Sequence, residues 1–355
     1  MNKVLKTGLF MSVIILFLFN CTDRTAHGNN AGGMRGTDSE KLPIIYSPGY
    51  SISLLGLEQL HAFDTAKYRT VYDFLRQNTG IAENRFHTPS EVTDRELLLV
   101  HTPGYLESLR DPRTASIIAG LTEVSLVPAQ LIEKGVYTPM RLATGGTVMG
   151  VSLALAHGWA INLSGGYHHA KADSGDGFCY FADIPIAVRV QWEKTPEMKV
   201  LIVDLDAHQG NGYEIIFGDD KRIAILDIFN ADIYPHDEAA KKYIDFPHPI
   251  ASGTGDRGYL ALLEKVLPEA LDTFSPGLVI YNAGTDIFEE DPLGKLEVTA
   301  RGIVKRDEIV FQESMKRKIP VLMLLSGGYT KKSGRIIAES CDNLVSSIIG
   351  KGGQP

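Results

Sequence analysis

The sequence predicts a single-domain α/β fold, in which a mostly parallel central sheet carries helices on both faces. Short apolar runs rich in β-branched residues alternate with longer stretches of helical spacing along the chain. No change of composition between residues 42 and 350 divides that segment. The chain has 355 residues, of which 44% are hydrophobic, and this length is enough to bury one large core.

The strands are expected where the apolar runs are short enough to be buried in a sheet. These runs are LPIIYS from 42, ELLLVH from 96, WAINLS from 159, VLIVDL from 200, RIAILDI from 222, LVIYNAG from 278 and VLMLLSGG from 321. Helices are expected over residues 143–157, 258–274, 300–316 and 334–349.

The first 41 residues differ from the rest. Residues 9–19 form an uncharged apolar run after Lys3 and Lys6, which is the layout of an export signal and too short to span a bilayer. We expect a signal segment over residues 1–20 and a flexible polar tether over 21–41, with a disordered tail at 351–355.

The start of the chain resembles a bacterial lipoprotein signal, which implies an exported protein of the cell envelope, held at a membrane by lipid on Cys21. Phe19 and Asn20 stand where such signals usually have small residues. Ordinary secretion and an uncleaved anchor are therefore alternatives.

Net charge and cysteine content exclude some classes of protein. The formal net charge is −8, which disfavours nucleic acid as a partner. Cys21, Cys179 and Cys341 are far apart and odd in number, so no disulfide framework is expected. The oligomeric state is left open.

Polar residues follow four of the predicted strands. Each signal is weak alone, because a tandem histidine pair is more often structural than catalytic. In a parallel sheet, however, the carboxyl ends of the strands meet at one edge, where ligands bind. Two carboxylates and one imidazole there supply three ligands and leave a position open, as a hydrolytic zinc site requires. The residues at that edge are His168, His169, Asp206, His208, Asp286 and Tyr329.

Asp204, Asp206 and His208 are spaced two residues apart, so in an extended segment they face one side. Asp206 and His208 can then reach a metal, while Asp204 lies behind them. Asp204 would either orient a histidine or cap the end of its strand.

The chain resembles the arginase and deacetylase superfamily, and within it the class IV histone deacetylases most closely. The resemblance is carried by HAFDTAKY from 61, GWAINLSGGYHHAKADSGDGFCYFADI from 158, LIVDLDAHQGNGYE from 201, YNAGTDIFEEDPLG from 281, GIVKRDEIV from 302 and SGGYTKKSGRIIAES from 326. It implies an arginase/deacetylase-like fold and a zinc-dependent deacylase domain over residues 42–350.

The resemblance also implies the roles of single residues. Asp206, His208 and Asp286 would bind Zn²⁺, while His168 and His169 flank the attacking water and Tyr329 donates to the developing oxyanion. The acyl tunnel would be lined by Gly177, Phe178 and Tyr234, with Gly165 and Gly166 near its floor. Behind the two histidines would lie Asp204 and Asn211.

Asn211 departs from the best-known class I enzymes, which carry Asp behind the second histidine. An amide stabilises imidazolium less than a carboxylate does, so His169 should be a neutral base. The resemblance implies an acyl-lysine peptide, protein or other acylated amine as substrate, and class IV enzymes resemble one another in preferring long fatty-acyl groups.

Three other functions are alternatives. An acetylpolyamine amidohydrolase would use the same ligands, and only substrate assays separate the two. A binuclear manganese ureohydrolase needs further carboxylates, whereas Phe288 stands two residues after Asp286. A noncatalytic acyl-lysine binder is the third alternative.

Overall fold

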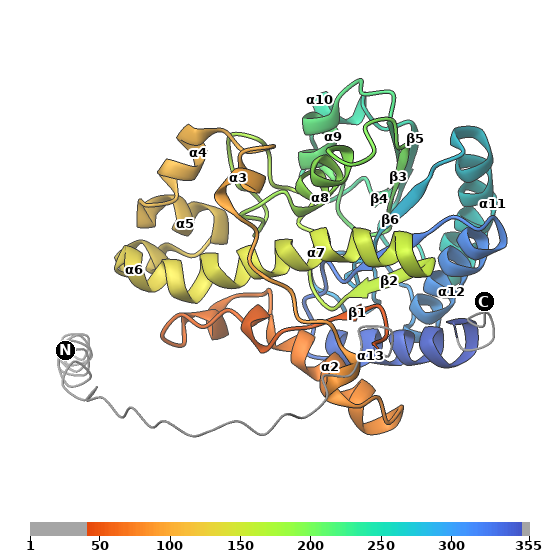
Figure 1. Cartoon of the computed structure of the whole chain (residues 1–355), viewed down its shortest axis with the longest axis horizontal. Coiled ribbons are helices and arrows are strands. Elements are labelled where there is room, and N and C mark those ends of the chain that lie inside the picture. The colour runs from red at the N-terminus through yellow and green to blue at the C-terminus, as the bar shows by residue number, and fades with distance from the viewer. Residues whose placement is uncertain (1–40, 350–355) are drawn as a thin grey trace. The chain divides into compact units, whose positions relative to one another are not determined.

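The centre of the fold is a parallel sheet (Figure 1). The structure, a computed structural model, describes residues 41–349. In these residues seven strands lie in the order β1-β2-β7-β6-β3-β4-β5, and every neighbouring pair is parallel. The strands are β1 (Ile44–Ile45), β2 (Trp159–Asn162), β3 (Val200–Asp204), β4 (Ile223–Asn230), β5 (Phe246–Ile250), β6 (Leu278–Asn282) and β7 (Val321–Leu324).

The connections between strands are mostly helical. The α-helices are α2 (Ala66–Asn78), α3 (Asp94–Leu97), α4 (Pro103–Ser108), α5 (Pro112–Ala119), α6 (Ala129–Ile132), α7 (Thr138–His157), α8 (Asp183–Trp192), α9 (Asn211–Phe217), α10 (Glu238–Lys241), α11 (Asp256–Phe274), α12 (Ala300–Lys316) and α13 (Ser333–Asn343). Two π-helical segments, Glu133–Tyr137 and Leu344–Ile349, adjoin α7 and α13.

Helices cover both faces of the sheet, because successive side chains of each strand point to opposite sides. In β3, Leu201 and Val203 pack into a core with α2, α11, α12 and α13. Val200 and Ile202 point the other way, into a second core with α7, α8 and α9. The predicted α/β architecture is confirmed, as are the four predicted helices.

One predicted strand is wrong. ELLLVH from 96 begins inside helix α3 and continues into turns, because Thr93 caps this segment. The Thr93 hydroxyl accepts from the backbone N–H of Glu96, and the Glu96 carboxylate accepts from the N–H of Thr93, which is a reciprocal capping box that starts a helix.

One strand was not predicted. β5 has the sequence FPHPI, and proline is rare in strands because it has no N–H for the ladder. β5 lies at an edge of the sheet, next to β4 alone, which is where proline is tolerated.

The signal, tether and lipid predicted at the N-terminus, and the disordered tail at 351–355, lie outside the described residues. Within residues 41–349 no helix has both the length and the apolar character needed to cross a bilayer.

We expect Gly145→Ala to destabilise the fold, although alanine is the better helix former. A Cβ at Gly145 in α7 would lie 1.9 Å from the carbonyl oxygen of Ser90, so the loop at 90 would have to move. Overpacking of this kind costs about 1 to 3 kcal/mol, which urea denaturation would measure.

The matched control is Gly258→Ala in α11. Its Cβ would meet only the Thr254 side chain, at 3.4 Å, so the variant should gain about 0.5 to 1 kcal/mol from helix propensity. Equal stability of the two variants would contradict the close approach of α7 to residue 90.

Candidate active site

The predicted site residues follow β2, β3, β6 and β7, and these four strands are neighbours in the order β2-β7-β6-β3. Their carboxyl ends therefore lie side by side. The loop after β2 carries His168 and His169, that after β3 carries Asp206 and His208, and the loops after β6 and β7 carry Asp286 and Tyr329. The structure brings all six together, as the strand-end argument predicts.

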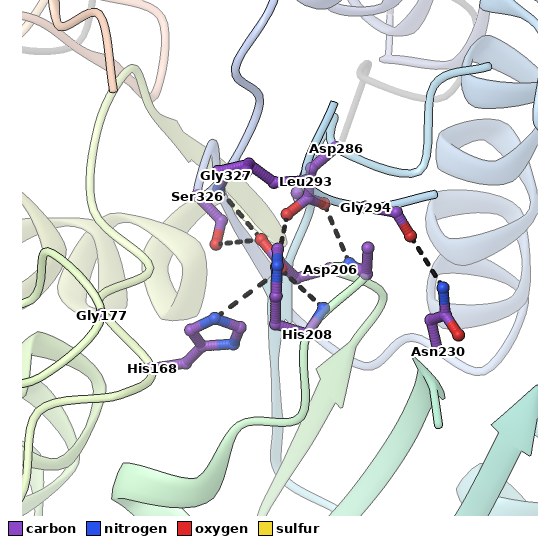
Figure 2. Close-up of polar contacts among 12 residues, drawn as sticks. His168, Gly177, Asp206, His208, Asn230, Asp286, Leu293, Gly294, Ser326 and Gly327 are labelled. Carbon is purple, nitrogen blue, oxygen red and sulfur yellow. Dashed lines mark hydrogen bonds and ion pairs between the residues drawn. The ribbon is translucent and has the colours of Figure 1, made fainter. Parts of the chain in front are cut away.

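Three of these residues form a cluster that could hold a metal ion. One ligand atom from each of Asp206, His208 and Asp286 lies within 4.8 Å of the others, and all three side chains are buried (Figure 2). His208 Nδ1 lies 3.0 Å from Asp206 Oδ1 and 2.9 Å from Asp286 Oδ2. Ligands about 2.0 to 2.2 Å from a tetrahedral zinc ion are roughly 3.3 to 3.6 Å apart, so this donor set would fit zinc if His208 Nδ1 and the two oxygens moved apart by roughly half an ångström.

Each ligand carboxylate is also held by the backbone. Asp206 Oδ2 accepts from Ser326 Oγ and from the N–H of Gly327, both at 3.0 Å, while Asp286 Oδ1 accepts from the N–H of Ala207 at 2.9 Å (Figure 2). A Cβ at Gly327 would lie 2.5 Å from an oxygen of each carboxylate. The loop after β7 therefore needs glycine here, a residue that sequence reasoning did not assign to the site.

The two ligand carboxylates repel one another. Burial, followed by the neighbouring charge of Asp206, raises the pKa of Asp286 to about 7. The pair thus resists carrying two negative charges until a cation shares them.

Asp204 lies behind His168, as predicted. Its Oδ2 is 2.9 Å from His168 Nδ1, and it also accepts from the Tyr213 hydroxyl at 2.5 Å and the Asn282 amide at 3.1 Å. Burial opposes protonation of His168, but the charges of Asp204 and Asp206 outweigh it and raise the pKa of His168 to about 9. The two neighbouring carboxylates therefore favour the protonated, cationic form of His168.

His169 differs because its partner is neutral. Its Nδ1 lies 2.8 Å from Asn211 Oδ1, and Asn211 Nδ2 donates to Asp237 Oδ2 at 3.2 Å. Since an amide oxygen only accepts, Nδ1 carries the proton and Nε2 is left with a free lone pair. Burial, together with His168 and His208, holds the pKa of His169 well below its usual value. His169 can act as a base.

Tyr329 lies beside the candidate metal ligands, with its ring centroid 6.1 Å from that of His208. The N–H of Tyr329 donates to Asp291 Oδ2 at 2.7 Å, which fixes the backbone. Burial, then the charges of Asp206 and Asp286, keeps the pKa of Tyr329 well above its usual value, so the hydroxyl keeps its proton.

The cavity that leads to these residues has aromatic and glycine walls. Gly177, Phe178 and Tyr234 line it together with His169 and Tyr329. The Tyr234 ring centroid lies 5.0 Å from that of His169, and the side chain is 41% exposed at the mouth.

The two glycines predicted near the floor lie differently. Gly166 lines a second, smaller cavity, which also contacts His168, Asp206 and Tyr329. Gly165 lies behind it, where a Cβ would lie 2.6 Å from the Thr147 hydroxyl and 2.8 Å from an Asp183 oxygen.

Sequence reasoning missed Lys67, within the quoted HAFDTAKY run. Its ammonium group is buried and donates to the carbonyls of Ser326, Gly327 and Gly328 at 2.7, 3.0 and 3.4 Å. Burial lowers the pKa of Lys67 to about 8, against the attraction of Asp286 and Asp206. Lys67 thus holds the loop that supports Asp206; a single lysine in a helix gives no sign of such burial.

Three comparisons with known proteins bear on this arrangement. The histone deacetylase domain matches residues 61–346. Histone deacetylase 2 of Arabidopsis thaliana is 44% identical over 304 residues, which cover 86% of this chain and 79% of that protein. An uncharacterized protein of Picosynechococcus is 33% identical over 291 residues, or 81% of this chain and 92% of that one. The crystal structure of the HDA15 HD domain has the same fold, with a TM-score of 0.70 and 22% identity, over 89% of this chain and 91% of that chain.

We expect Asp286→Ala to abolish binding of a divalent metal, since it removes one of three ligands and the acceptor of the Ala207 N–H. Metal analysis of the variant, after loading with zinc and removal of unbound zinc, should show almost no bound metal. Asp232→Ala, at the rim of the cavity, is the control and should keep one equivalent. Full retention by Asp286→Ala would remove this residue from the ligand set.

Proposed function

The chain belongs to the histone deacetylase family, and we propose that it is a zinc-dependent amidohydrolase that removes acyl groups from lysine side chains. Family membership supports hydrolysis of an amide. One observation carries the proposal. A cluster of three candidate metal ligands lies at the inner end of one cavity, next to a neutral His169 and a protonated Tyr329.

Asp206, His208 and Asp286 would hold the zinc ion. When bound, zinc supplies Lewis acidity, which lowers the pKa of water and polarises the amide carbonyl. Three protein ligands leave a coordination position open for reactants, as in catalytic rather than structural zinc sites.

The two histidines would divide the proton transfers between them. His169 Nε2, kept unprotonated by the amide of Asn211, would accept a proton from the attacking water and then deliver it to the leaving amine. His168, kept charged by Asp204, would stabilise the negative charge that develops. Tyr329 would donate its hydroxyl hydrogen to the former carbonyl oxygen.

The ligand set supports a single metal. Within residues 41–349, Asp206, His208 and Asp286 are the sole cluster of this kind, whereas a binuclear ureohydrolase needs additional bridging carboxylates. An acetylpolyamine amidohydrolase is the second candidate. Its cationic substrate is favoured by Asp176 and Asp232 at the rim of the cavity, and these carboxylates would suit a lysine peptide equally.

The proposal is tested with zinc-loaded protein and a panel of acyl-lysine peptides and acylpolyamines of several chain lengths. Turnover of acyl-lysine peptides supports it. Turnover of acylpolyamines alone would favour the second candidate, and binding with no turnover of either class would identify a noncatalytic acyl-lysine binder.

His169→Ala and Tyr329→Phe should keep the metal and lose most of the rate. Removal of a general base costs about 10²- to 10⁴-fold, and removal of an oxyanion donor about 10²- to 10³-fold. Steady-state kinetics with parallel metal analysis would check both. His157→Ala, exposed at the end of α7, should have normal kinetics, and unimpaired turnover by His169→Ala would rule out its role as base.

We further propose that the acyl group is a long chain. An apolar side cavity, lined among others by Leu57, Ala119, Val136 and Met140, shares Phe178 with the substrate cavity. The side cavity has a volume of about 50 Å³, which holds only a few methylene groups beyond Phe178, so a longer chain would have to widen it. The preference for long chains is also implied by the likeness to class IV enzymes.

Ala119→Phe should fill this side cavity. We expect kcat/KM for a myristoyl-lysine peptide to fall roughly 10-fold or more, with little change for acetyl-lysine. Leu126→Phe is the control, because Leu126 is 85% exposed. A wild-type enzyme that cleaves acetyl-lysine at least as efficiently as myristoyl-lysine would refute the preference.

We also propose that the protein is exported and lipid-anchored at Cys21, on the grounds of the apolar run at 9–19 followed by Cys21 and a polar segment. The full-length protein is expressed in a lipoprotein-processing bacterium beside Cys21→Ser. Wild type should enter the detergent phase and Cys21→Ser should not, because multiple acyl chains bind membranes firmly. Identical aqueous partitioning of the two proteins would disprove the anchor.

A further inference from the structure

Arg306 of α12 is fully buried, although a guanidinium group is costly to remove from water. Its donors have partners on three segments. Nε donates to Asp307 Oδ1 at 2.8 Å, and Nη2 donates to the carbonyl of Ala283 at 3.2 Å. Nη1 donates to the carbonyls of Leu205 at 3.2 Å and Gly284 at 2.5 Å. The charge is thus offset by one carboxylate and three backbone oxygens.

These carbonyls belong to the two loops that carry the metal ligands. Leu205 directly precedes Asp206, and Gly284 stands two residues before Asp286. One planar guanidinium group therefore connects the end of β3 to the end of β6, just before each of the two loops reaches its metal-binding aspartate. The Tyr259 hydroxyl donates to the same Leu205 carbonyl at 3.2 Å.

The guanidinium group is itself held in place through Asp307. That carboxylate accepts hydrogen bonds from the hydroxyls of Tyr281 in β6 and Ser340 in α13. Arg306 cannot shift without disturbing the packing of α12 against the sheet and α13. The guanidinium group is therefore held on one side by the two loops and on the other by Asp307.

We propose that Arg306 is a positioning residue of the metal site, which fixes the separation of the Asp206 and Asp286 loops and thereby sets the affinity for the metal. This inference rests on the metal site of the proposed function. The hydrogen bonds of Arg306 to these two loops go to backbone carbonyls and not to the side chains of Asp206 or Asp286, so it acts on the site through the backbone.

Arg306→Lys tests the geometry while keeping the charge, because an ammonium group is a point donor and cannot reach carbonyls on both loops as a planar fork does. Using full-length protein, we would measure the zinc dissociation constant by chelator competition, the rate of zinc release, and the absorption spectrum of the cobalt-substituted site. We expect zinc affinity about 10- to 100-fold weaker, faster release and a changed cobalt spectrum. Arg335→Lys, 61% exposed on α13, should match wild type.

A second variant guards against misfolding. Arg306→Met combined with Asp307→Asn removes both charges. The asparagine oxygen can accept from the Tyr281 hydroxyl, and its NH₂ group can donate to the Ser340 hydroxyl oxygen. Such replacements of buried ion pairs are often tolerated. Thermal unfolding of the metal-free protein reports whether each variant folds, and this double variant should also bind zinc weakly.

The inference is overturned if either folded variant keeps the wild-type zinc affinity and cobalt spectrum. It is also overturned if neither variant folds without metal, because Arg306 would then be a residue of the core. Wild-type protein that binds zinc but does not cleave acyl-lysine would refute the proposed hydrolysis and leave the role of Arg306 intact.

Discussion

The structure depends on the accommodation of two buried carboxylates, Asp206 and Asp286, that face the same imidazole ring. Both side chains are almost completely buried, so protein groups must replace water as their hydrogen-bond partners. Backbone N–H groups supply part of this, from Ala207 and Gly327. Parallel strands make such an arrangement possible, because their carboxyl ends deliver loops from distant parts of the sequence to one edge.

The parts of the fold and site that follow a short-range pattern could be predicted from the sequence. Six of the seven predicted strands are recognisable as short apolar runs, and the long helices have apolar residues at helical spacing. The metal cluster follows because each ligand comes directly after such a strand. The spacing of Asp204, Asp206 and His208 predicted that Asp204 lies behind the two candidate ligands, and the resemblance implied its pairing with His168, a contact that the structure has.

The remainder depends on packing between distant segments. Nothing local shows that Lys67 is buried, since a lysine in an amphipathic helix is normally exposed. Asp237 meets Asn211 only because the segment before α10 lies next to α9. In ELLLVH the apolar run predicts a strand, whereas the Thr93 capping box just before it is a local signal for the start of a helix. The prolines of β5 argue against a strand, and only the order of strands in the complete sheet shows that this segment lies at an edge, where proline is tolerated.

Those prolines have a consequence for the behaviour of the protein in a crowded solution. An open sheet edge is a template on which a second chain can add a strand, and such additions lead to aggregation. At one edge, Pro247 and Pro249 leave β5 with two fewer N–H donors for an incoming strand. At the other, β1 is only two residues long. Both borders are therefore poor templates for intermolecular pairing, so the largely apolar strands between them are protected from joining fibrillar assemblies.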